Sequence, residues 1–105
     1  MTDILETVTF KLANGVDQNA FLAANVAMTE WASRQTGFRY RSLSQFDDGS
    51  WIDVVYWASK ADVEAADVNF KATMMSSDFV MMIDPNSFEL RHSTIQARNM
   101  AEQVA

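Results

Sequence analysis

The chain has 105 residues, of which 14 are acidic and 8 are basic, so its formal net charge is −6. This length predicts one domain, 1–105, with a core at about 4–95 and a tail at 96–105, and a hydrophobic content of 49% predicts a globular chain. The acidic balance argues against nucleic acid and anionic membrane as partners, because both require basic patches.

Several kinds of site and location are disfavoured by what the sequence lacks. It contains no cysteine, which excludes disulfides, thiol nucleophiles and thiolate metal sites. One histidine and no cysteine argue against a zinc site, and no dinucleotide-binding, P-loop or serine-hydrolase motif is found. The start, MTDILETVTF, has no basic segment followed by an apolar core, and no apolar run approaches the roughly 20 residues that span a bilayer. We therefore expect a cytoplasmic protein.

The first two predicted elements are a strand and a helix. Residues 4–12 alternate in polarity and are rich in Thr, Val and Phe, which is typical of a strand. Residues 17–34 place apolar side chains at helical spacing, with Asn14 or Asp17 available as the cap. Gly37 follows, as glycine often does past the C-terminus of a helix.

A hairpin and a second helix come next. Strands are predicted at 38–46 and 51–58, and Asp47-Asp48-Gly49 between them is typical of a tight turn. Ser59 and Asp62 have capping-box spacing, which predicts a helix that runs to about Met75.

The last part of the chain is predicted to hold a short helix, a strand and a tail. The short helix covers 76–82, and Asp84-Pro85 ends it because the residue before proline avoids helical geometry. A final strand covers 88–95, and the tail 96–105 is interpreted as a frayed helix.

The order β-α-β-β-α-β predicts an α+β, ferredoxin-like fold: a four-stranded antiparallel sheet with both long helices on one face. The third strand has large apolar side chains on both faces, and the helices cover only one of them. The other face carries Ile52, Val54 and Tyr56. Left bare, it would be larger than the apolar patches that soluble monomers usually expose, so we expect a homodimer through the sheet faces.

Two runs carry a resemblance to a known family. The run DVVYWASKADVEAA (53–66) and the later run MMIDPNSFELRH (81–92) resemble the antibiotic-biosynthesis-monooxygenase superfamily, which consists of small dimeric α/β-barrel proteins. The resemblance implies one cavity per subunit, between the sheet and the helices. Characterised members oxygenate phenolic polyketides without metal or flavin, or degrade haem, and others isomerise or dismutate. Trp57 matches a pocket tryptophan of the haem-degrading branch, but the first strand has no Asn and the second helix no His, which makes haem breakdown doubtful.

The leading candidates for catalysis are His92, Asp53 and Tyr40. His92 is the only imidazole, so any histidine catalysis near neutral pH must use it. Asp53 is a carboxylate on a mostly apolar strand face, which is either a site or a salt bridge to a nearby arginine. The candidate arginines are Arg39, Arg41 and Arg91. Glu6 invites the same two interpretations and could lie close to Asp53, with one pKa raised. Tyr40 could offer its hydroxyl to a substrate oxygen.

Four side chains are candidates for binding a substrate: Trp57, Trp31, Phe70 and Met74. The two indoles could sandwich a flat ring, and the phenyl and thioether groups could line the apolar cavity. Plain core packing is the alternative for each.

The sequence thus predicts a cofactor-independent monooxygenase-like enzyme for a small aromatic or polyketide-like molecule, with His92 or Asp53 as base. One alternative is a non-catalytic dimeric protein that binds a small molecule or serves in a stress response. Another is an isomerase or decarboxylase that uses the same base without oxygen.

Overall fold

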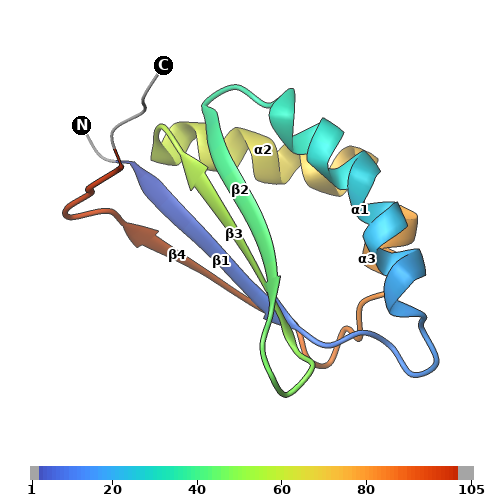
Figure 1. Cartoon of the computed structure of the whole chain (residues 1–105). Helices are drawn as coiled ribbons and strands as arrows, with labels where there is room; N and C mark the ends of the chain where they lie inside the picture. Colours follow the sequence, from blue (N-terminus) through green and yellow to red (C-terminus); the bar gives the residue numbers. More distant parts are fainter. Residues whose placement is uncertain (1–2, 102–105) are drawn as a thin grey trace.

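The computed structural model describes residues 3–101 (Figure 1). In chain order its elements are β1 (Ile4–Phe10), α1 (Gln18–Ser33), β2 (Phe38–Gln45), β3 (Trp51–Trp57), α2 (Lys60–Thr73), α3 (Asp78–Met81) and β4 (Glu89–Thr94). Each helix begins at a side-chain cap, because Asp17, Ser59 and Ser77 each accept a hydrogen bond from the backbone three residues on.

The four strands form one antiparallel sheet in the order β2-β3-β1-β4. Figure 1 shows the helices on one side of this sheet and the other side open. The predicted α+β, ferredoxin-like fold is confirmed. No helix within residues 3–101 is long and apolar enough to cross a membrane.

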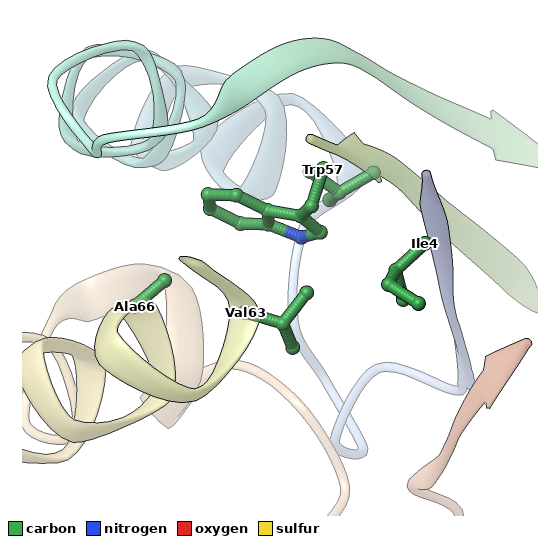
Figure 2. Close-up of a cluster of buried hydrophobic side chains, with 5 residues drawn as sticks. Ile4, Trp57, Val63 and Ala66 are labelled. Carbon is green, nitrogen blue, oxygen red and sulfur yellow. The ribbon is translucent and has the colours of Figure 1, made fainter. Parts of the chain in front are cut away.

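The interior side of the sheet holds two clusters of buried side chains. At one end, Trp57 packs with Ile4 of β1 and with Val63 and Ala66 of α2 (Figure 2). At the other end, an aromatic cluster joins the sheet to α1 and α3 and contains Phe10, Phe21, Trp51 and Phe79. In that cluster the rings of Phe21 and Phe79 are stacked with centroids 4.8 Å apart.

Strand β3 shows the alternation that the sequence predicts. Its odd-numbered residues, from Trp51 to Trp57, are buried under the helices, while Ile52, Val54 and Tyr56 are only half-buried on the open side. The helices therefore leave this face of β3 uncovered in the single chain, as the sequence predicts.

Strand β4 lies at one edge of the sheet, next to β1. Helix α1 contacts β2 and helix α2 contacts β3, whereas every residue of β4 is exposed. A gap is thus left between α2 and β4, on the interior side of β1.

The tail differs from its predicted form. Residues 96–101 have no helix, and the remainder of the predicted helix lies outside the described residues. The backbone N–H of Ile95 donates to the carbonyl of Asp3, and Arg98 pairs with the buried Asp3 carboxylate. These contacts hold the first part of the tail beside the start of β1.

Candidate functional site

The centre of the candidate site is a pair of side chains on neighbouring strands. Glu6 of β1 is directly opposite His92 of β4, and both side chains point to the helix side. The imidazole Nε2 lies 2.8 Å from Glu6 Oε2. This spacing is a hydrogen bond that holds the ring in one orientation.

Glu6 is held in a buried setting. It is 9% exposed, and the indole N–H of Trp57 donates to its Oε1 over 3.3 Å. Burial raises the pKa of Glu6 above its ordinary value of 4.5, and the negative charge of Asp67 raises it further. The contacts with His92 and Trp57 act in the opposite direction on the same pKa.

A cleft of about 240 Å³ opens beside this pair, between α2 and the β1–β4 edge. Ile4 and Val63 contribute its apolar part, and polar and charged groups surround them. The other lining residues are Lys60, Glu64, Asp67, His92, Ser93 and Thr94. This volume is below the roughly 300 Å³ at which most ligand pockets begin, so the cleft suits only a small molecule.

Glu6, Asp67 and His92 could also ligate a metal ion. Each offers one ligand atom, and these three atoms lie within 4.8 Å of one another. One nitrogen and two carboxylate oxygens are reasonable ligands for a divalent ion. However, the Glu6–His92 hydrogen bond already occupies Nε2 of the ring. The arrangement is better described as a hydrogen-bonded pair with a second carboxylate nearby.

Asp53 lies elsewhere and has a structural partner. Arg41 donates to both of its carboxylate oxygens, over 2.9 and 2.8 Å, and both side chains are more than nine-tenths buried. The same guanidinium donates to Thr29 and lies 5.6 Å from the ring centre of Phe79. Of the two interpretations open for Asp53, the geometry supports the salt bridge.

Glu6 and Asp53 are not a carboxylate pair. Asp53 is opposite Val8 on β1, whereas Glu6 is opposite Val55. The raised pKa of Glu6 comes from burial and from Asp67, and not from Asp53.

Tyr40 lies on the open face of the sheet, away from the cleft. Its ring packs edge-on against Tyr56 with centroids 5.6 Å apart, and the residue is 56% exposed. A register shift between Phe38 and Tyr40 pairs Phe38 with the buried Trp57 and Tyr40 with Tyr56, which lies on the open face. The structure does not bring Tyr40 together with His92 on one side of the sheet, as the predicted site required.

Of the four predicted binding residues, Trp57 and Met74 are buried, whereas Trp31 and Phe70 are half-buried. Trp57 is 2% exposed. Figure 2 shows its indole beside Val63 and Ala66. Trp31 contacts Phe70 with ring centroids 5.5 Å apart. None of them is among the residues that line the cleft beside His92. Only Trp57 reaches the site, through its bond to Glu6.

Asp67 is the site residue that sequence reasoning missed. Lys60, Glu64 and Asp67 share the spacing i, i+4, i+7, which places them along one face of a helix. That periodicity was visible in the sequence, but nothing indicated that this face would border the first and last strands.

Comparisons with known proteins support the fold. No protein-family model and no curated protein sequence matches the chain. Among solved structures, SnoaB, a cofactor-independent oxygenase from Streptomyces nogalater, has a TM-score of 0.68 at 14% identity and covers 98% of this chain and 100% of that chain. The monooxygenase ActVA-Orf6 of Streptomyces coelicolor, in complex with nanaomycin D, has a TM-score of 0.65 at 14% identity, with 96% of this chain and 94% of that chain covered.

A dimeric ferredoxin-like protein from an uncultured marine organism has a TM-score of 0.71 at 8% identity, with coverage of 97% of this chain and 95% of that chain. Identities this low establish the fold and leave the chemistry open. The resemblance to antibiotic-biosynthesis-type monooxygenases is thus confirmed at the level of the fold: this chain has the architecture of these small oxygenases and ferredoxin-like proteins over nearly its whole length.

Proposed function

We propose that the protein is a cofactor-independent, monooxygenase-like enzyme that acts on a small aromatic or polyketide-like molecule in the cleft between α2 and β4. The observation that carries this proposal is the Glu6–His92 pair, which places the only imidazole of the chain against a buried carboxylate at the edge of that cleft. The fold shared with SnoaB and ActVA-Orf6 supports it.

The pair has the parts of a general base. When Nε2–H donates to Glu6, the lone pair of the ring is on Nδ1, and the carboxylate stabilises the imidazolium that forms after proton transfer. The indole of Trp57 orients the carboxylate through Oε1. Trp57 therefore acts as a positioning residue rather than as a wall of the cleft.

The proposed reaction balances without a cofactor. A CH₂ group activated by an aromatic ketone loses one proton to His92, and the carbanion transfers electrons to O₂. One oxygen atom ends as a carbonyl on that carbon, and the other leaves as water with the two hydrogens of the CH₂ group. The substrate is oxidised and O₂ is reduced.

Oxygen uptake with a panel of aromatic ketones that carry an acidic CH₂ group tests this function. We expect turnover in air and none under nitrogen, and a loss of about 100-fold or more in kcat for His92→Gln. Glu30→Gln is the control, because it changes an exposed carboxylate on α1 outside the cleft. Full activity in His92→Gln would rule out the assigned base, and product formation under nitrogen would instead indicate an isomerase or decarboxylase.

A second candidate is a non-catalytic protein that binds a small molecule. The observation that favours it is the Arg41–Asp53 pair, which leaves the other predicted base without a chemical role. Binding of a panel compound without any oxygen uptake or product distinguishes this candidate from the enzyme.

A further inference from the structure

The cleft beside Glu6 and His92 has an uneven distribution of charge. Three carboxylates face it or border it, from Glu6 of β1 and from Glu64 and Asp67 of α2. The basic groups that line it are Lys60 and the imidazole of His92.

The charges are also separated along the cleft. A carboxylate oxygen of Asp67 lies within 4.8 Å of a carboxylate oxygen of Glu6 and of a ring nitrogen of His92. Lys60 is seven residues earlier on α2, which corresponds to about 10 Å along the helix axis. The end of the cleft at Asp67 is therefore acidic, and Lys60 lies toward the opposite end.

Asp67 is available to a ligand. His92 and Trp57 already bond to Glu6, whereas none of the ion pairs between residues 3–101 involves Asp67. Its side chain is half-buried at the wall of the cleft, where a charge interacts more strongly than in open water. A cation placed there would relieve the repulsion between Asp67 and Glu6.

We infer that Asp67 is a specificity-determining residue that selects substrates with a protonated amine close to the aromatic ring. This inference rests on the proposed function for the identity of the site. The ring would contact Ile4 and Val63, and the ammonium group would lie between Asp67 and the Glu6–His92 pair. A substrate with a carboxylate at the same place would be repelled.

The test uses three ring compounds of similar size and different charge: benzylamine, benzyl alcohol and phenylacetate. The chain has one histidine, so the imidazole resonances of His92 report binding without overlap in NMR titrations at neutral pH. We expect benzylamine to bind about tenfold more tightly than phenylacetate, with the alcohol between them.

The variants isolate the role of Asp67. Asp67→Asn is expected to remove most of the preference for the amine, whereas Glu30→Gln, which removes one negative charge from an exposed site on α1, is expected to keep it. Lys60→Gln provides a second variant on α2, and it should weaken phenylacetate relative to the amine.

The outcomes are separable from those of the function test. Equal affinity for amine and carboxylate, or an amine preference that Asp67→Asn leaves intact, overturns the inference even if oxygen uptake is observed. Failure of every probe to shift the His92 signals overturns it as well. An amine preference that depends on Asp67, in a protein without oxygen uptake, supports the charge selection and contradicts the proposed enzyme.

Discussion

At the scale of single residues, Glu6 and Asp53 show how surroundings set the role of a carboxylate. Both are buried on the helix side of the sheet. Asp53 has two hydrogen bonds from a guanidinium, which neutralise its charge. Within the described residues, the side chain of Glu6 has an imidazole and an indole as its hydrogen-bond partners, and burial raises its pKa. Buried groups with perturbed pKa values tend to mark functional sites, which is why Glu6 and its partner form the better candidate.

The raised pKa of Glu6 predicts a pH dependence of stability. The folded state binds the proton of Glu6 more tightly than the unfolded state does, so the contribution of Glu6 to the free energy of unfolding falls as pH rises from about 4.5 through the raised value. Gln does not titrate. The comparison uses two chains that both carry His92→Gln, one with Glu6 and one with Glu6→Gln. In urea unfolding, the free energy of unfolding of the chain with Glu6→Gln minus that of the chain with Glu6 should therefore increase with pH over this window. A difference that is constant with pH would contradict the burial of Glu6.

The Arg41–Asp53 pair predicts a large loss of stability when one partner is removed. Asp53→Asn leaves the guanidinium of Arg41 buried without a counter-charge, which should cost about 3–5 kcal/mol of the free energy of unfolding. Arg41→Met combined with Asp53→Leu should recover most of that loss in the same urea titrations, because neither residue is then charged. If Asp53→Asn were as stable as the unmodified chain, the pair would not be buried as described.

At the scale of elements, the start of α2 depends on the loop before β2. Ser59 caps α2 by accepting from the backbone of Asp62, and the hydroxyl of Ser59 also donates to Asp62 Oδ2. Gly37 lies against that carboxylate with a φ of +82°, and a Cβ atom there would be 2.1 Å from Asp62 Oδ2. The loop and the helix cap thus share one tightly packed contact.

Gly37→Ala is expected to destabilise the fold by more than Gly15→Ala. Both glycines have a positive φ, which costs roughly 1–2 kcal/mol for other residues. Gly15 has open space where a Cβ would be, so the difference between the two variants isolates the clash with Asp62. Thermal unfolding of both variants provides the measurement, and equal melting temperatures would mean that the Asp62 side chain moves aside without loss.

At the scale of the whole molecule, the sheet has an apolar face that the helices of a single chain do not cover. Ile52, Val54 and Tyr56 are half-buried there, and Tyr40 is exposed beside them. The protein from an uncultured marine organism with this fold is dimeric. We propose that a second copy covers this face, as expected from the sequence.

The proposed dimer predicts a mass of twice 11.8 kDa in light scattering after size exclusion. Val54→Asp introduces a charge in the centre of the open face and should shift the particle toward the mass of one chain. Val68→Asp is the matched control, because Val68 is 68% exposed on α2, and this variant should remain a dimer. A single-chain mass for the unmodified protein would contradict the proposal.

Most of the fold could be predicted from the sequence. Alternation and helical spacing are local properties, so the strands, the helices and the cap at Ser59 were predicted from neighbouring residues alone. For the first helix the sequence left Asn14 and Asp17 as candidate caps, and the structure has Asp17. The two-sided apolar character of β3 also followed from local pattern. The tail was predicted wrongly for 96–101, because its path depends on contacts with Asp3, ninety-five residues away from Arg98 in the chain.

The site was only partly predictable. His92 was identified from its residue type, because the chain has one imidazole, and the carboxylates stood out as charges on apolar strands. Their partners were decided by the tertiary structure: Arg41 rather than Arg39 or Arg91 for Asp53, and His92 rather than Asp53 for Glu6. The physical reason is that an ion pair depends on strand order, register and the reach of a helix. These are long-range properties, and one sequence specifies them only through the complete fold.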